Sequence, residues 1–194
     1  MPIAAFVADL DVPGWLCDAE AEFLIRAIVE HPTGGLCVDM GSFAGRSSAC
    51  LAFACKLRGD GSRVVSIEPF DSIHTRQARV TEETYWANLR RLGLESYVTQ
   101  HVERSPGAAR HVADASACLI FIDGDHAYQS VAADLAAWLP KLQRGGVLAM
   151  HDFRRGWILG QVWEAAHDVL PQVNWQEMQT ATGFGWWTKP GQGE

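Results

Sequence analysis

The sequence predicts an α/β fold, a doubly wound and mostly parallel sheet with helices on both faces. Short apolar runs alternate with stretches whose apolar residues recur at helical spacing. Glycine, proline and polar turn residues separate the two kinds of segment. Several of the apolar runs are continuous, which is typical of strands buried on both faces of a parallel sheet.

The first half of the chain alternates helix and strand. We expect a helix over 18–30, strands over 36–40 and 64–67, helices over 46–57 and 82–92, and a strand over 97–102. The first helix begins at Asp18, a good N-cap followed by an acidic first turn. The next two end at Gly59 and Gly93, because glycine readily adopts the left-handed conformation that terminates a helix.

The second half continues this alternation. After a short helix over 108–112 come a strand over 118–122, a helix over 128–139, a strand over 147–150, a helix over 160–169 and closing strands over 175–178 and 184–187. The sequence contains no internal repeat or linker. We therefore expect a single domain over 1–194, with a helical lead-in over about 1–35.

The composition is that of an ordinary globular protein and limits the class of partner. Of the 194 residues, 48% are hydrophobic and 20% are charged, which excludes a disordered or fibrous chain. The formal net charge is −7 and no cluster of Lys and Arg is present, whereas nucleic-acid binding requires basic groups that displace counterions from phosphates. A small-molecule substrate is therefore expected, and a nucleic acid is not.

The N-terminus and the cysteines indicate a cytoplasmic protein without a membrane partner. The apolar run that opens the chain ends at Asp9 and lacks the basic segment of a signal peptide. No apolar stretch reaches the ~18 residues that a membrane span needs. The five cysteines form no C-x-x-C pair, so we expect reduced thiols in the core. Association into a homo-oligomer is left open.

Polar side chains gather at the carboxyl ends of the predicted strands. They are Asp39 in the first strand, Glu68 after the second, Asp123, Asp125 and His126 after the strand over 118–122, and His151 and Asp152 after the strand over 147–150. Ligands of doubly wound sheets bind at this edge. Because burying so many carboxylates without a function would be costly, the pattern predicts a site.

The loop that follows the first strand is typical of a nucleotide site. Gly41 permits a tight turn with positive φ, and Gly45 permits close approach of the next helix to a ligand. The loop lacks the spacing and the lysine of a P-loop, since Arg46 stands there, and Phe43 replaces the middle glycine of a dinucleotide site. Glu68, 23 residues after Gly45, can accept both ribose hydroxyls. Together these features indicate an adenosine ligand without a pyrophosphate.

Spaced motifs over about 14–153 resemble those of class I S-adenosylmethionine-dependent methyltransferases, in particular the small-molecule branch related to the macrocin O-methyltransferase and cephalosporin-cluster methyltransferase families. The matching segments are Asp39 to Ser47, Ile67-Glu68-Pro69, Ile122-Asp123-Gly124-Asp125-His126-Ala127-Tyr128, Asp134 with Trp138, Gly145-Gly146 and His151-Asp152. The resemblance implies a Rossmann-like, seven-stranded sheet with an antiparallel C-terminal hairpin. It also implies that the part over about 154–194 varies with the substrate.

The same resemblance implies S-adenosyl-L-methionine as the cofactor. Its contacts would be Asp39, Gly41, Ser42, Gly45 and Ser47 around the loop, Glu68 at the ribose, Ser105 at the adenine edge, and Asp123. Several relatives bind Mg²⁺ through one acid after the fourth strand and two after the fifth, which here gives Asp123, His151 and Asp152. The histidine departs from that pattern because Mg²⁺ prefers oxygen ligands, so a Mg²⁺ or Mn²⁺ site is left open.

Methyl transfer to a hydroxyl needs a general base, a metal ion or both, because the hydroxyl has a high pKa. Asp125, His126 and His151 are the candidate bases. Each also has a structural interpretation, since Asp125 can cap the following helix and either histidine can be held by hydrogen bonds within the fold. The predicted activity is O-methylation of a small hydroxylated molecule such as a sugar, a phenol or a secondary metabolite. The loop that contains His74 is a candidate lid.

Two alternative functions remain, a nicotinamide-dependent oxidoreductase on the same fold and a non-catalytic adenosine-binding module. Phe43 argues against the first, and the polar groups after two later strands argue against the second. Asp134 and Trp138, one helical turn apart, are interpreted as surface and core packing. Among the five tryptophans over 157–187, one or two are expected to line an apolar substrate pocket.

Overall fold

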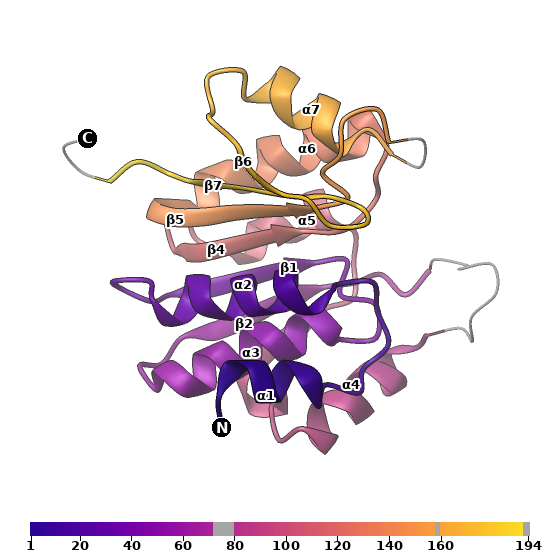
Figure 1. Cartoon of the computed structure of the whole chain (residues 1–194), viewed down its shortest axis with the longest axis vertical. Coiled ribbons are helices and arrows are strands. Elements are labelled where there is room, and N and C mark those ends of the chain that lie inside the picture. Colours follow the sequence, from indigo (N-terminus) through magenta and orange to yellow (C-terminus); the bar gives the residue numbers. More distant parts are fainter. Residues whose placement is uncertain (72–79, 158–159, 192–194) are drawn as a thin grey trace.

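A computed structural model describes residues 1–71, 80–157 and 160–191, and this part of the chain forms one mixed sheet (Figure 1). Its strands are β1 (Leu36–Met40), β2 (Arg63–Ile67), β3 (Val98–His101), β4 (Ala117–Ile122), β5 (Leu142–His151), β6 (Gln176–Met178) and β7 (Phe184–Thr188). They lie in the order β3-β2-β1-β4-β5-β7-β6. Strands β1 to β5 are parallel, whereas β7 is antiparallel to both β5 and β6. The predicted parallel sheet and antiparallel C-terminal hairpin are confirmed.

Helices cover both faces of the sheet, as predicted. They are α1 (Ile3–Ala8), α2 (Asp18–Val29), α3 (Arg46–Arg58), α4 (Glu82–Arg91), α5 (Ser105–Ala108), α6 (Tyr128–Trp138) and α7 (Val162–Val169). The core on one face combines α1 to α4 with alternate strand residues such as Phe121, and the core on the other combines α5 to α7 with residues such as Ile120. Because successive strand residues point to opposite faces, each continuous apolar strand contributes to both cores.

The register of the parallel strands brings their carboxyl ends to one edge. Met40 of β1 lies beside both Ile67 of β2 and Ile122 of β4, and Ile122 lies beside Met150 of β5. The polar residues that follow these four strands therefore start from neighbouring positions. This arrangement confirms the expectation that motifs far apart in the sequence meet at a single edge.

Most element boundaries lie within two residues of the predicted ones, with two exceptions. Strand β5 begins at Leu142 rather than at residue 147, because Gly145 and Gly146 exchange backbone hydrogen bonds of 2.8 and 2.9 Å with Lys189 and so continue the sheet. Helix α5 begins at Ser105 rather than at residue 108, since the first turn of a helix tolerates a proline.

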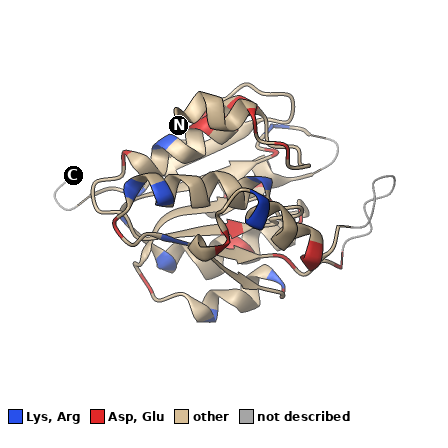
Figure 2. Cartoon of the chain, turned by 90° about the horizontal axis from the view of Figure 1, so that it is seen from below, with Lys and Arg blue, Asp and Glu red and all other residues tan. Residues whose placement is uncertain are grey.

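Charged residues are spread over the described part of the chain. In the view of Figure 2, Lys and Arg occur on several elements and are interspersed with Asp and Glu. Among the described residues, no helix is long and apolar enough to cross a membrane. All five cysteines lie in the described part and are free, and four of them are buried, as predicted. His74 and its candidate lid lie outside the described residues.

Candidate active site

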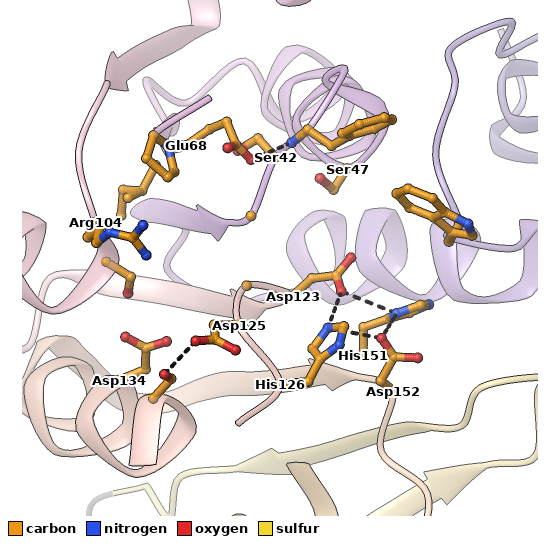
Figure 3. Close-up of a pocket in the computed structure, with 18 of the residues that line it drawn as sticks. Ser42, Ser47, Glu68, Arg104, Asp123, Asp125, His126, Asp134, His151 and Asp152 are labelled. Carbon is orange, nitrogen blue, oxygen red and sulfur yellow. Dashed lines mark hydrogen bonds and ion pairs between the residues drawn. The ribbon is translucent and has the colours of Figure 1, made fainter. Parts of the chain in front are cut away.

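A cavity of about 930 Å³ opens at the carboxyl ends of the parallel strands (Figure 3). Ten of the twelve predicted site residues line it: Gly41, Ser42, Ser47, Glu68, Ser105, Asp123, Asp125, His126, His151 and Asp152. Asp39 and Gly45 are not part of the wall. The structure thus brings together residues from five segments of the sequence around one space large enough for a small-molecule ligand.

Asp39 lies beneath the loop that follows β1 rather than against the cavity. Its side chain is fully buried, and Oδ2 accepts hydrogen bonds from the hydroxyls of Ser47 (3.0 Å) and Ser48. Burial raises the pKa of Asp39 to about 6, although the serine hydroxyls oppose this rise. In this structure Asp39 anchors the first turn of α3 and so fixes the loop above it.

Both predicted loop glycines adopt positive φ, +83° at Gly41 and +94° at Gly45, but the atoms that approach them belong to the protein. A Cβ at Gly41 would lie 2.0 Å from the carbonyl oxygen of Asp123, and one at Gly45 would lie 3.1 Å from the ring of Tyr85. Gly41 therefore lets the loop after β1 pass directly over the backbone that follows β4. This close passage places Asp123 on the same wall as the loop.

Glu68 joins the loops that follow β1 and β2. Its Oε2 accepts a hydrogen bond from the backbone N–H of Phe43, and its Oε1 accepts one from that of Phe70, both at 2.9 Å. Each carboxylate oxygen has a second lone pair with which it can accept another hydrogen bond. Since Glu68 also lines the cavity, it can accept hydroxyl groups of a ligand while it holds the two loops.

Two carboxylates and two imidazoles alternate in a ring on another side of the cavity (Figure 3). His126 Nε2 lies 3.0 Å from Asp152 Oδ2 and 3.7 Å from Asp123 Oδ1, and His151 Nδ1 lies 3.3 and 3.2 Å from the same oxygens. We call Asp123, His126, His151 and Asp152 the Asp–His ring. Asp152 has a φ of +53°, an uncommon conformation for a residue other than glycine that often occurs at functional sites.

His151 is the buried member of the ring, and its surroundings make it a cation. Its side chain is 1% exposed, and Nε2 lies 3.4 Å from Glu20 Oε2 and 3.3 Å from the hydroxyl of Thr182. Burial alone would lower the pKa of His151, but the carboxylates of Asp123, Asp152 and Glu20 outweigh this effect and raise it to about 12. The imidazolium therefore offsets part of the negative charge of these three carboxylates.

A divalent ion at the predicted ligands Asp123, His151 and Asp152 does not fit this arrangement. Both ring nitrogens of His151 face carboxylates, so both carry protons and neither offers a lone pair to a metal. His126 is close enough to replace it in a group with the two aspartates, but Mg²⁺ and Mn²⁺ prefer oxygen donors. A dication would also lie beside the buried imidazolium. The His151 imidazolium therefore supplies the positive charge that a metal ion would otherwise bring to the Asp–His ring.

Asp125 points away from the Asp–His ring, toward the end of the cavity where Asp134 lies (Figure 3). Its Oδ2 accepts a hydrogen bond from the hydroxyl of Ser130 (2.7 Å), and its Oδ1 accepts one from the backbone N–H of Ala127 (3.1 Å). These bonds lower the pKa of Asp125 and fix it at the start of α6. Asp125 therefore has a structural role ahead of α6, but it does not cap the helix as predicted, since the N-cap is Ala127 and has no side-chain cap hydrogen bond. A carboxylate of lowered pKa is also a weak base.

Aromatic side chains border the cavity. Trp157 lines it, in line with the expectation for the tryptophans over 157–187, and Trp15 and Phe43 line it with ring centroids 5.0 Å apart. Arg46 holds the segment that carries Trp15, because its guanidinium donates to the carbonyl oxygens of Leu16 (2.8 Å) and two earlier residues. The N-terminal segment, predicted as a helical lead-in over about 1–35, thus forms part of the cavity wall.

Two buried carboxylates near the cavity were not predicted as site residues. Glu20 is 1% exposed, pairs with His151 and accepts hydrogen bonds from the backbone of Cys17 (2.9 Å) and the hydroxyl of Thr180 (2.5 Å). Burial would raise the pKa of Glu20, but these contacts lower it overall. Asp134 is 3% exposed and lines the cavity, so its interpretation as a surface residue is wrong. Trp138 is in the core, as predicted.

Comparison with known protein families shows which family contains this site. Residues 38–153 match a family described as a methyltransferase domain. The chain belongs to this methyltransferase family. The matched region begins in β1 and ends just after Asp152, so it includes the loop after β1, Glu68 and the whole Asp–His ring.

Individual relatives of this methyltransferase domain are more distant. Over 81 residues it is 32% identical to the uncharacterized protein y4gI of Sinorhizobium fredii, a match that covers 40% of this chain but only 9% of that protein. The O-methyltransferase TomG of Streptomyces achromogenes, solved with SAM, has a TM-score of 0.70 and 18% identity over 97% of this chain and 88% of its own. An O-methyltransferase of Bacillus cereus, solved with SAH, has a TM-score of 0.68 and 18% identity over 96% and 88%. These structures share the fold.

Proposed function

We propose that this chain transfers the methyl group of S-adenosylmethionine to a hydroxyl of a small molecule, with His126 as the general base. The observation that carries this proposal is a single cavity in which a glycine loop and Glu68 face the Asp–His ring. The glycine loop and Glu68 are suited to an adenosine ligand without a pyrophosphate. The Asp–His ring is suited to the removal of a proton. O-methyltransferases with the same fold and with SAM or SAH bound support the assignment.

The cofactor would lie across the carboxyl ends of β2, β1 and β4. Glu68 would accept the ribose hydroxyls, and Gly41, Ser42 and Ser47 would face the methionine portion. Asp123, which follows β4, would then be the member of the Asp–His ring nearest to the methionine portion. When bound, S-adenosylmethionine supplies an electrophilic methyl group on a sulfonium.

His126 would accept the proton of the acceptor hydroxyl during an in-line displacement. It lines the cavity with a side chain that is 32% exposed, whereas the side chain of His151 is 1% exposed. Asp123 and Asp152 orient the His126 ring and stabilise the imidazolium that forms when it takes up the proton. His151 is already a cation, so it serves to keep these two carboxylates in place rather than to accept a proton.

The aromatic border favours an acceptor with an apolar or ring-shaped body. Such a molecule can pack against the rings of Trp15, Phe43 and Trp157, while His126 of the Asp–His ring would accept the proton of its hydroxyl. Phenols and sugars with hydroxyl groups are therefore the first acceptors to test. A mass-shift screen of such compounds with S-adenosylmethionine would identify products heavier by one methyl group.

Ligand binding tests the cofactor assignment directly. Isothermal titration calorimetry should show binding of both S-adenosylmethionine and S-adenosylhomocysteine and little binding of NAD. The reason is that Phe43 occupies the place where a pyrophosphate would need a glycine. Tight binding of NAD without a response to either sulfur ligand would contradict the proposal and support the oxidoreductase alternative.

Replacement of Glu68 tests the ribose contact. Glu68→Ala should weaken S-adenosylhomocysteine binding by ~1.5–3 kcal/mol, the range for a hydrogen bond to a charged group. Glu68→Gln keeps the shape but has one acceptor oxygen, so a smaller loss is expected. Both are measured by calorimetry, with circular dichroism to confirm folding because Glu68 also holds Phe43 and Phe70. Unchanged affinity in folded Glu68→Ala would show that the ribose is held elsewhere.

A further inference from the structure

Asp134 is a buried carboxylate on the cavity wall that the proposed chemistry does not use. It is 3% exposed, and its Oδ1 is buried without a hydrogen-bond partner. Burying an acceptor without a partner costs free energy, and an apolar side chain at this position of α6 would avoid that cost. The carboxylate has a hydrogen bond with Ser105, but Oδ1 is left without a donor, so Asp134 is suited to a ligand that supplies one.

The packing of α5 against α6 fixes the position of Asp134. Trp138, one turn further along α6, donates from Nε1 to the hydroxyl oxygen of Ser105 (3.0 Å) and to its backbone carbonyl (3.2 Å). The hydroxyl of Ser105 in turn lies 2.8 Å from the sulfur of Met40 at the end of β1. Asp134 consequently stays next to the first residue of α5, with little freedom to turn toward solvent.

The charges around Asp134 leave its carboxylate without a cation. Arg104 lies at the same end of the cavity (Figure 3), but its guanidinium pairs with Asp71 at 2.6 Å. Asp125, the neighbouring carboxylate, is bonded to Ser130 and to backbone. Burial raises the pKa of Asp134 to about 6, with a smaller contribution from the charge of Asp125, although a hydrogen bond with Ser105 opposes the rise. The group is therefore mostly ionised at neutral pH and can only accept hydrogen bonds.

The position of Asp134 relative to Glu68 indicates which part of the ligand it meets. The site runs from the Asp–His ring, past the loop after β1 and Glu68, to the end formed by α5 and α6 (Figure 3). If Glu68 holds the ribose and the methyl group points to the ring, the base must lie toward α5 and α6. The exocyclic amino group is the hydrogen-bond donor on the base edge of adenine.

We propose that Asp134 selects adenine by accepting a hydrogen bond from its exocyclic amino group. This inference rests on the proposed function, since it requires an adenosine cofactor in the cavity. Oδ1 would receive the donor that it lacks in the protein alone. Asp134 would then be a specificity-determining residue for the base, separate from the residues that act on the acceptor.

A double-mutant cycle between protein and ligand tests this contact. The probes are S-adenosylhomocysteine and its analogue with unsubstituted purine, which lacks the amino group. Calorimetry should show that the wild type binds the analogue about tenfold more weakly or worse, the scale of a hydrogen bond to a charged acceptor. In Asp134→Ala the two ligands should bind within about twofold of each other, because the partner of the amino group is gone.

Two further variants make the outcome unambiguous. Asp134→Asn keeps the shape with a neutral acceptor, so its preference for adenine should fall between those of the wild type and Asp134→Ala. Asp168→Asn, in α7, removes an exposed carboxylate that bonds to Tyr128 and should keep the wild-type preference. If the alanine and asparagine variants bind S-adenosylhomocysteine but keep the wild-type ratio, the role of Asp134 is overturned while the proposed function stands. If the wild type does not bind S-adenosylhomocysteine, both proposals fail.

Discussion

Replacing His151 with leucine is expected to lower the free energy of unfolding by about 3–5 kcal/mol, the range for breaking a buried ion pair by removal of one partner. The substitution leaves the carboxylates of Glu20, Asp123 and Asp152 near one another without the imidazolium that offsets part of their negative charge. Urea denaturation at neutral pH, with the wild type and the variant compared at the same protein concentration, measures this loss.

A surface histidine provides the matched control. His111 pairs with Glu103 at 2.7 Å, but its side chain is 34% exposed, so His111→Leu should cost no more than about 1 kcal/mol. The double variant His151→Leu with Glu20→Gln should recover part of the loss, because it removes one of the uncompensated charges. Equal losses in the two histidine variants would show that His151 is not the structural cation described above.

The pH dependence of stability follows from the same contacts. The pKa of His151 in the folded protein, about 12, lies above its ordinary value near 6.5. The contribution of His151 to the free energy of unfolding is therefore fully present below about pH 6.5. This contribution is lost as the pH rises from there toward 12. The difference in stability between the wild type and His151→Leu should therefore narrow in alkaline solution.

The sequence was sufficient to predict the fold and the edge at which the site lies, because both depend on local patterns. Strands β1, β2 and β4 are mostly apolar and almost entirely buried, which requires a layer of helices on each face of the sheet, and parallel strands place their carboxyl ends together. Asp39, Glu68, Asp123 and His151 could be assigned to one region on that basis alone. Which of them face the cavity could not be predicted, since this depends on tertiary contacts: Asp39, inside β1, is covered by Ser47 and Ser48, whereas Glu68 lies just past the end of β2 and lines the cavity.

The two missed carboxylates show where pattern analysis failed. Glu20 lies four residues before Leu24 and eight before Ile28, and Asp134 lies three after Val131 and four before Trp138. These spacings place each acid on the buried stripe of its helix, where a charged residue needs a partner or a ligand. The helical periodicity therefore indicated that Glu20 and Asp134 are buried. Their partners come from distant segments, which the sequence alone did not identify.

Replacing His126 with alanine is expected to lower kcat/KM for methyl transfer by about 10²–10⁴-fold, the usual contribution of a positioned general base. Binding of S-adenosylhomocysteine should change little, because the loop after β1 and Glu68 lie on another side of the cavity. The rate is measured with an acceptor found in the mass-shift screen, and the affinity by calorimetry. Asp125→Asn is the matched control, and it should retain most of the activity because Asp125 serves the start of α6.

The pH profile distinguishes a base from a structural histidine. The carboxylates of Asp123 and Asp152 raise the pKa of His126 above its ordinary value near 6.5, although burial opposes this effect. Because only the neutral imidazole accepts a proton, kcat/KM should fall as the pH drops through this raised pKa. Asp152→Asn removes a negative charge, lowers that pKa and should move the acid limb to lower pH.

Chelation separates this mechanism from the metal-assisted alternative. The Asp–His ring supplies a protein cation where a dication would lie, so the wild type dialysed against EDTA should keep its activity. A loss that Mg²⁺ or Mn²⁺ restores would show that the ring binds an ion and that the ion, rather than His126 alone, promotes deprotonation of the acceptor. An acid limb that stays in place in Asp152→Asn would likewise exclude His126 as the titrating base, because its pKa must respond to a charge 3.0 Å away.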